Sequence, residues 1–437
     1  MGRVERGGMR RTTCVIIGGG PAGMVLGLLL ARRGIRVTVL EKHRDFLRDF
    51  RGDTVHPSTL RLLDDLGLFE RFDALPQSRV TQFRLPTADG RDVVLADLSR
   101  LRTPHPYIAM VPQWDLLDLL AEAAMAEPTF TLRREHEVTG VLRGGGRVRG
   151  VTFRAPEGDG EIEADLTVAC DGRWSTVRRA LDLPSRAYPV PFDVWWFRIT
   201  TDQHLAEALL PRVRRGRIGI AIPRRGYVQV AWIGRKGTDA AVRADGIDAF
   251  RAEVAELLPD LARDAASVAS MDDVKHLDVR LDRLRRWHAH GVVCIGDAAH
   301  AMSPAGGVGI NLAIQDAVAT ARLLAEPLRA GTLAGPRSGR ILARIQRRRT
   351  FPTVVIQMLQ RAVHARVIAP VLAGRTTAVL PRGADIVLRI LPVLTVIPAF
   401  VIGIGPRAER APRWARGSPG PPTDRSRRTA PMSEDVG

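Results

Sequence analysis

Cysteine and aromatic residues are scarce in this sequence. Cysteine occurs only at Cys14, Cys170 and Cys294 among 437 residues, each time in an apolar run typical of a buried strand. A buried thiol behaves as a small hydrophobic group. The spacing argues against disulfides and against a metal centre, and it favours a reducing, cytoplasmic location. Aromatic residues make up 5% of the chain.

The formal net charge of +18 is carried mainly by arginine, which gathers near both ends and in residues 337–349. Aromatic side chains are not interleaved with these charges, and nucleic-acid-binding motifs are lacking. We therefore expect solvated basic faces and no nucleic-acid partner. The basic residues 1–11 lead into a glycine-rich loop instead of a cleavage site, so we expect no signal peptide.

A glycine turn follows the first apolar segment. Residues 12–17 predict a strand, 24–33 a helix and 35–40 a second strand, and Gly18, Gly20 and Gly23 lie between the first two. Such a turn lets a pyrophosphate approach the backbone at a helix N-terminus. Glu41 ends the second strand, where a carboxylate binds a ribose 2′-hydroxyl. This unit predicts dinucleotide binding.

The rest of the pattern predicts an α/β fold: a Rossmann-like domain, an inserted antiparallel β-sheet domain and C-terminal helices. Residues 190–200 and 218–233 are rich in β-branched and aromatic residues, which predicts antiparallel strands. We assign residues 12–80, 107–185 and 281–330 to the first domain, 81–106 and 186–280 to the second, 331–404 to the helices, and 405–437 to a disordered tail. The apolar residues 384–404 predict a packed helix, not a transmembrane span, although contact with a membrane interface stays open.

Two further motifs follow buried strands. In Gly296-Asp297-Ala298-Ala299-His300, Asp297 lies at a sheet edge where it would bind a polyol hydroxyl. The following segment, Ser303 to Asn311, is glycine-rich and opens onto a helix whose N-terminus would stabilise the negative edge of a reduced flavin ring. In the third motif, residues 170–178, we expect Asp171 and Arg178 to pair across a turn.

These three motifs, in this order, resemble the class A FAD-dependent monooxygenases, the para-hydroxybenzoate hydroxylase-like family of aromatic and polyketide hydroxylases. The resemblance covers about residues 14–324. It implies cofactor contacts from Gly18, Gly20, Pro21, Ala22, Gly23, Glu41, Lys42, Arg51, Gln113, Asp171, Asp297, Pro304, Gly307, Gly309, Ile310 and Asn311. It also places Pro304, Gly306 and Gly307 beside the reacting flavin ring, so we predict a catalytic role for these three.

The family's chemistry is implied by the same resemblance. NADPH or NADH reduces FAD, O2 adds at flavin C4a, and the resulting hydroperoxide hydroxylates the substrate. The protein supplies orientation and exclusion of water. His56 and His300 neighbour cofactor motifs, but we favour hydrogen bonding to backbone over a role as base. The sequence does not decide between a monomer and a homodimer.

The strand over residues 190–200 predicts two faces, with Phe192, Val194 and Trp196 on one and Trp195, Phe197 and Ile199 on the other. Substrate contacts are predicted for Trp196, Ile220 and Tyr227. The probable strands show no polar cluster, which favours a bulky, apolar, aromatic or polycyclic substrate.

Other reactions on the same fold stay open at this point. Baeyer-Villiger oxidation and epoxidation use the same oxidant. A halogenase is disfavoured because residues 218–223 lack both tryptophans of that family's signature and only three lysines occur. A flavoprotein without catalysis is disfavoured by the intact motifs.

Overall fold

The strands of the central sheet, sheet A, are apolar on both sides. This pattern is expected because other helices and strands cover both faces of the sheet. In the computed structural model, which describes residues 10–47, 54–86, 92–203, 211–224, 226–335, 338–376, 388 and 390–417, five of its strands are parallel. The order is β19-β20-β11-β1-β2-β8, and β10 and β9 continue antiparallel from β11. The strands are β1 (Arg10–Ile17), β2 (Val37–Leu40), β8 (Phe130–Arg133), β9 (Glu137–Gly144), β10 (Arg147–Ala155), β11 (Gly158–Ala169), β19 (His288–Ala289) and β20 (Val292–Cys294).

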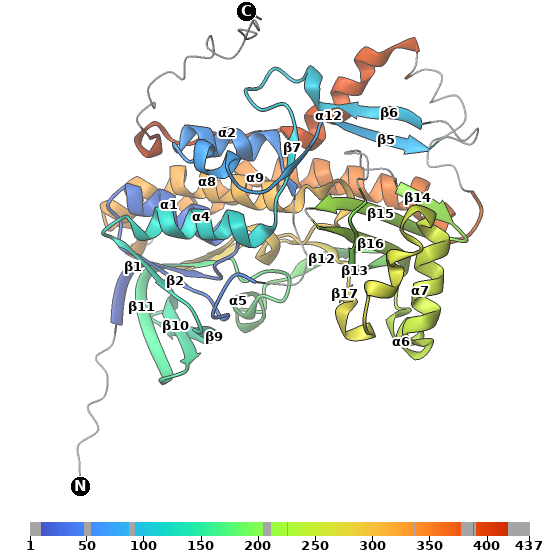
Figure 1. Ribbon diagram of the computed structural model, residues 1–437. Coiled ribbons are helices and arrows are strands. Elements are labelled where there is room, and N and C mark those ends of the chain that lie inside the picture. The colour runs from blue at the N-terminus through green and yellow to red at the C-terminus, as the bar shows by residue number, and fades with distance from the viewer. Residues whose placement is uncertain are drawn as a thin grey trace, which may run out of the picture.

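Helices cover one face of sheet A (Figure 1). Cys14 and Ile16 of β1 point into the core shared with these helices, whereas Val15 and Ile17 point into the core on the opposite face. The helices are α1 (Pro21–Arg32), α2 (Pro57–Asp65), α3 (Phe69–Asp73), α4 (Gln113–Met125) and α8 (Gly309–Arg329), and the short α5 (Thr176–Ala180) lies on the other side with β9 and β10. All three cysteines are free.

Sheet E is the predicted antiparallel sheet, with strand order β14-β15-β16-β13-β17. Its strands are β13 (Phe192–Thr200), β14 (Pro211–Arg214), β15 (Arg217–Arg224), β16 (Tyr227–Arg235) and β17 (Lys275–Leu277). Trp195, Phe197 and Ile199 pack under α6 (Asp239–Ala244) and α7 (Gly246–Leu257), while Phe192 and Val194 pack on the opposite face. The predicted division of the 190–200 strand into two faces is confirmed. The α/β fold class with a second, antiparallel sheet is confirmed as well.

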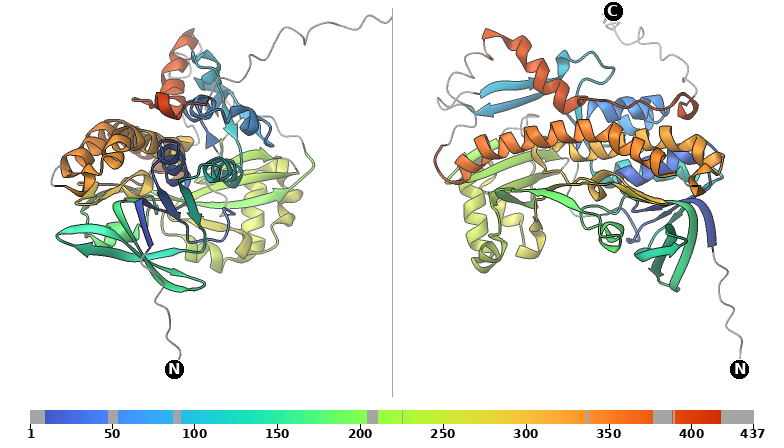
Figure 2. Two further views of the ribbon diagram at one scale, coloured as in Figure 1. Left: turned by 90° about the vertical axis from the view of Figure 1, so that its left-hand side faces the viewer. Right: turned by 180° about the vertical axis from the view of Figure 1, so that it is seen from behind.

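Smaller sheets and the C-terminal helices join the two large sheets. The sheets are β3-β7-β4 (Thr54–Val55, Ile108–Met110, Ser78–Val80), β5-β6 (Gln82–Pro86, Asp92–Asp97) and β12-β18 (Ser185–Tyr188, Leu281–Leu284). The helices are α9 (Ser338–Val363), a π-helical turn η8 (His364–Ile368), α10 (Ala369–Leu372), the 3₁₀ turn η9 (Pro392–Thr395) and α12 (Val396–Gly403). Seen from behind, α9 runs along the middle of the molecule, and α12 lies above it (Figure 2).

One helical stretch, Ala305–Arg329, is long and apolar enough to cross a membrane by length and composition. Its most apolar window is 78% buried within the protein. This stretch, which contains α8, therefore packs as a core helix against α1.

Residues 405–417 correct the expectation of a disordered tail. Glu409 is 4% exposed and accepts two hydrogen bonds from Arg348, and Ala411 and Ala415 belong to the core under α1. The prediction was wrong here because it was made from overall composition. Composition does not show that Glu409 pairs with a distant arginine or that Ala411 and Ala415 pack into a distant core. Residues 418–437 lie outside the described residues.

Candidate active site

The first glycine turn brings the start of α1 against the end of β11. Gly18 has φ +94°, and a Cβ there would lie 2.6 Å from the Cys170 carbonyl oxygen. A Cβ on Gly23 would lie 2.0 Å from the Gly18 carbonyl oxygen, so both glycines are needed for this close packing. Around Gly20, in contrast, a Cβ would meet nothing within 4 Å. Gly20 is thus the glycine that leaves open space at the helix N-terminus.

The N-terminus of α1 offers unsatisfied amide groups to a ligand. Gly20 is the N-cap residue, and no side chain caps the helix. Pro21 is its first residue and Ala22 its second. The first-turn amides and the helix dipole favour an anion at this point.

Of the other predicted cofactor contacts, Glu41 lies directly at this turn. Glu41 follows β2, is buried, and accepts a hydrogen bond from the Gly19 amide at 2.7 Å. Lys42 is exposed beside it, and Gln113, half-buried, is the first residue of α4. Arg51 lies outside the described residues.

The Asp297 loop lies against the starts of two helices. Gly296 follows β20 with φ +58°, and a Cβ there would lie 3.1 Å from Ala313 Cβ on α8 and 3.5 Å from Ala22 Cβ on α1. The two glycine motifs, far apart in the sequence, therefore meet at Gly296. Asp297 keeps a third of its side chain exposed, with Arg173 Nη2 at 3.9 Å.

The Pro304–Asn311 segment forms a tight loop before α8. Gly306 and Gly307 both adopt left-handed conformations, with φ of +82° and +64°. A Cβ on Gly307 would lie 2.7 Å from Thr54 Oγ1, which instead donates to the Gly307 carbonyl at 3.0 Å. The loop is therefore held against β3 by a contact that only glycine permits.

The first turn of α8 begins at Gly309 without a side-chain cap. Ile310 is half-buried, and Asn311 is buried. Asn311 Oδ1 accepts hydrogen bonds from the His56 amide at 3.1 Å and from Thr59 Oγ1 at 2.6 Å. Its Nδ2 finds no partner among the described residues. A buried amide donor without a partner fits a site that a ligand completes.

The predicted pairing of Asp171 with Arg178 is wrong. Asp171 Oδ2 instead accepts from the amides of Thr176 and Val177, at 2.8 and 3.4 Å, at the start of α5. Arg178 forms a bidentate pair with Asp282, at 3.1 and 3.0 Å. Asp282 lies on β18, and the sequence holds no local signal for so distant a partner. Burial raises the pKa of Asp171.

A buried ionic network holds the Asp297 loop from behind. Asp316 on α8 is fully buried, accepts from the Gly296 amide at 3.1 Å and lies 2.5 Å from His300 Nε2. Its other oxygen accepts from Arg349 Nε at 2.7 Å. Burial by itself would raise the pKa of Asp316, but the charges of His300 and Arg349 hold it below its usual value. The His300 ring therefore supports the loop through the Asp316 carboxylate, and not through the backbone hydrogen bond that the sequence analysis favoured.

The helix α9 and its π turn hold the other side of the loop. Gln360 Nε2 donates to the Ser303 carbonyl at 2.8 Å and the Ala305 carbonyl at 3.0 Å. Ser303 Oγ lies 2.9 Å from His364 Nε2. Pro304 is thus fixed on both sides by side chains from one helical stretch. The sequence did not single out Gln360 or His364, because a helix of mixed composition gives no sign of which side chains point at a loop.

Sheet E directs the predicted substrate face toward these loops. Trp196 and Ile220, both half-buried, pack with Met110 of β7 and Leu98 in one apolar cluster. Met110 pairs with Thr54, the residue bonded to Gly307. Trp196 Nε1 is buried and has no partner among the described residues. The face with Trp196 is therefore the one toward the Gly306-Gly307 loop, which the sequence left open.

The strand register also gathers polar side chains that the sequence did not show as a cluster. Arg198 lies opposite Gln229 on the Trp196 face, and the next row along that face holds Tyr227 opposite Arg224. The Arg198 guanidinium lies 4.9 Å from the Tyr227 ring centre. Arg224 also donates to the Met110 carbonyl. The expectation that the strands show no polar cluster was wrong because the register, not the local sequence, sets which residues become neighbours.

The residues at these loops fit an extended dinucleotide such as FAD. Two uncapped helix N-termini meet at one edge of sheet A, Gly20 leaves space beside one of them, and Asn311 leaves an unused donor at the other. Ligands of doubly wound sheets bind at the carboxyl ends of the strands, which is this edge.

The comparisons with known proteins agree with this geometry. The FAD binding domain family matches residues 11–350. A 6-methylpretetramide 4-monooxygenase from Streptomyces rimosus is 34% identical over 420 residues, which cover 93% of this chain and 96% of that relative. The chain belongs to the FAD-dependent aromatic hydroxylase family. It is a flavoprotein monooxygenase, and the family assignment drawn from the sequence motifs is confirmed.

Two solved structures share its fold. An anhydrotetracycline hydroxylase from Streptomyces rimosus has a TM-score of 0.70 and 28% identity, covering 90% of this chain and 76% of that one. A probable FAD-dependent monooxygenase from Pseudomonas aeruginosa, 24% identical, has a TM-score of 0.68 over 84% of this chain and 99% of that one.

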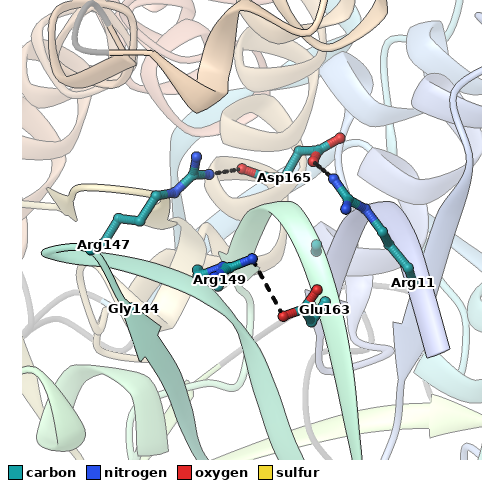
Figure 3. A pocket seen from close by; sticks show the side chains of 8 residues that line it. Arg11, Gly144, Arg147, Arg149, Glu163 and Asp165 are labelled. Atoms are coloured by element: carbon teal, nitrogen blue, oxygen red, sulfur yellow. Dashed lines mark hydrogen bonds and ion pairs between the residues drawn. The ribbon is translucent and has the colours of Figure 1, made fainter. Parts of the chain in front are cut away.

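A separate hollow of about 360 Å³ in the hydroxylase is lined by residues on or beside β1, β9, β10 and β11 (Figure 3). Arg11 and Arg149 in its wall form ion pairs with Asp165 and Glu163, at 3.0 and 3.6 Å. It lies near the amino end of β1, whereas the glycine loops of the candidate site follow the carboxyl ends of the strands. Because acids pair with two of its three arginines and it lies at the opposite end of β1 from these loops, we do not assign it to the candidate site.

The hydroxylase is expected to lose stability as the pH falls from about 6.5 to about 4. Burial lowers the pKa of His56 to about 4, although carbonyl groups of Ile402 and Gly307 oppose the shift. Over that range the unfolded chain binds a proton at this histidine and the folded chain does not, so acid favours unfolding by up to about 3 kcal/mol. Burial also lowers the pKa of His364, so this histidine adds to the loss of stability in acid.

Urea denaturation at several pH values, for the wild type and for His56→Asn, measures this effect. The variant should be less stable near pH 7 and should show a shallower decline toward pH 4. An identical pH dependence in both proteins would exclude a buried neutral histidine as the cause.

Proposed function

We propose that the protein hydroxylates a bulky polycyclic phenol, with NADPH or NADH as the reductant and O2 as the oxygen source. The observation that carries the proposal is the position of the Trp196 face of sheet E, which is linked through Met110 and Thr54 to the Gly307 loop. The relative that acts on 6-methylpretetramide supports a polycyclic substrate. The three free cysteines support a reducing, cytoplasmic location.

FAD, when bound, supplies the redox and oxygen chemistry. The chain's own residues bind and orient it: the starts of α1 and α8 would hold its negative groups, and Asp297 would accept a hydrogen bond from a polyol hydroxyl. Pro304, Gly306 and Gly307 would lie beside the ring, where their backbone excludes water and leaves no side chain in the way. Gln360 and His364 hold this backbone in place.

The substrate would lie between these loops and sheet E. Its apolar rings would pack on Trp196 and Ile220, and Trp196 Nε1 would donate to one of its oxygens. Farther along the same face, Arg198 and Tyr227 would bind an acidic or enolic oxygen, because a guanidinium stabilises an anion. A polar end therefore refines the purely apolar substrate that the sequence indicated.

Anaerobic mixing of the FAD-loaded protein with NADPH, across a panel of polycyclic phenols, tests the proposal. We expect at least one acidic polycyclic phenol to accelerate flavin bleaching by more than about tenfold and to yield a product heavier by one oxygen atom when air is admitted. Trp196→Ala should raise KM for that phenol. Bleaching at one rate with every compound, and no oxygenated product, would contradict the proposal.

A further inference from the structure

The solvent face of α9 carries positive charge without acidic compensation. The helix contains no Asp or Glu between Ser338 and Val363. Arg340, Arg344 and Arg347 are exposed at helical spacing, and none of them forms an ion pair within the part of the chain that the structure describes. Arg348 and Arg349, by contrast, point inward to Glu409 and Asp316. The outer row therefore has no structural partner to explain it.

Large apolar side chains continue this row. Phe351 is 54% exposed and Met358 is 61% exposed on the following turns of α9. On η9 and α12, Val393 and Ile397 are each 60% exposed and Phe400 is 46% exposed, again at helical spacing. In the described part of the chain, eight of the eleven exposed large apolar residues lie on α9 or in residues 390–400. Such a concentration marks an interaction surface rather than scattered exposure.

One apolar cluster connects the two helices. It contains Ile356 from the inner side of α9 and Val401 and Ile402 of α12, and the view from behind shows α12 above α9 on the same side of the molecule (Figure 2). Residues 390–404 contain no charged residue. We call the exposed side chains of α9 and of residues 390–400 the α9–α12 surface.

We propose that the α9–α12 surface docks the protein on an anionic lipid bilayer. A row of arginines beside protruding aliphatic and aromatic side chains is the pattern of an interfacial helix, in which the cations meet lipid phosphates and the apolar groups enter the headgroup boundary. A symmetric dimer through the same surface would bring the unpaired arginines of two copies together, which is unfavourable. This inference does not depend on the proposed substrate.

Flotation with lipid vesicles tests the proposal on the full FAD-loaded protein. We expect binding to vesicles of equal parts phosphatidylglycerol and phosphatidylcholine, weakened by salt, and little binding to phosphatidylcholine alone. Phe351→Ser with Ile397→Ser should lower partitioning at least about tenfold. Replacing Arg340, Arg344 and Arg347 by Gln should lower it about fivefold per arginine. Met125→Ser, which removes an exposed apolar side chain on α4, is the matched control and should change nothing.

Each other outcome overturns the proposal. Equal binding by the wild type and the α9–α12 variants would place any lipid contact elsewhere. Binding to polyglutamate but not to vesicles would assign the surface to an acidic protein. Dimerisation that the variants abolish, without vesicle binding, would make it an interface between copies. Retained flavin absorbance shows that each variant is folded, and Phe351→Ser alone serves if the double variant loses FAD.

Discussion

Gly20→Ala is expected to weaken FAD binding about 10- to 100-fold while the apoprotein keeps its stability to within about 1 kcal/mol. The backbone of Gly20 is extended, with φ −74° and ψ −177°, and a Cβ there meets no protein atom within 4 Å. The methyl group would instead occupy the space through which a pyrophosphate reaches the start of α1. Fluorescence titration of the apoprotein with FAD and urea denaturation measure the two quantities.

Two further alanine variants make this test specific. Gly23→Ala should lower the free energy of unfolding by about 1–3 kcal/mol or more, because its Cβ would lie 2.0 Å from the Gly18 carbonyl oxygen. Gly339→Ala, on α9 and also without neighbours within 4 Å, should leave FAD affinity unchanged. If Gly20→Ala bound FAD as tightly as Gly339→Ala, the pyrophosphate would not lie at this turn.

Arg349→Met is expected to lower the free energy of unfolding by about 3–5 kcal/mol and to reduce FAD retention. The substitution leaves the fully buried Asp316 carboxylate without the Arg349 guanidinium that compensates its charge, and an uncompensated buried charge is costly. It also loosens the support of the Gly296 amide, next to Asp297. Urea denaturation and FAD titration of the apoprotein measure both effects.

The control for this variant is Arg347→Met, two residues away on the exposed side of α9, which should change stability by less than about 0.5 kcal/mol. The double variant Arg349→Met with Asp316→Leu should recover part of the loss, because it removes the stranded carboxylate. Equal stability of the Arg347 and Arg349 variants would show that the buried network contributes nothing.

The sequence predicted those parts of the structure that local chemistry decides. Strands buried on both faces, glycines at positive φ and helix starts leave local patterns, and so β1, α1, the Gly296 turn and the Gly306-Gly307 loop were found. The two-residue period of a strand placed Trp195 and Trp196 on opposite faces. The sequence did not show which of these faces lies toward the site.

Contacts between distant segments were not predictable in the same way. Arg178 pairs with Asp282 and not with Asp171, and Arg349 pairs with Asp316, because the packing of whole elements chooses these partners. The Arg198, Tyr227 and Arg224 cluster depends on strand register. Glu409 lies in a stretch rich in proline and arginine, where composition predicts disorder, and only its burial against Arg348 shows otherwise.

The link from Arg349 to the Arg407 carbonyl and toward Glu409 has a consequence for biosynthesis. During translation, α1 and both glycine motifs leave the ribosome well before residues 405–417. Until that segment emerges, Arg349 lacks its contacts with Arg407 and Glu409. The nascent chain would therefore complete the support of the Asp297 loop, and with it the capture of the coenzyme, only after residues 405–417 have been synthesised.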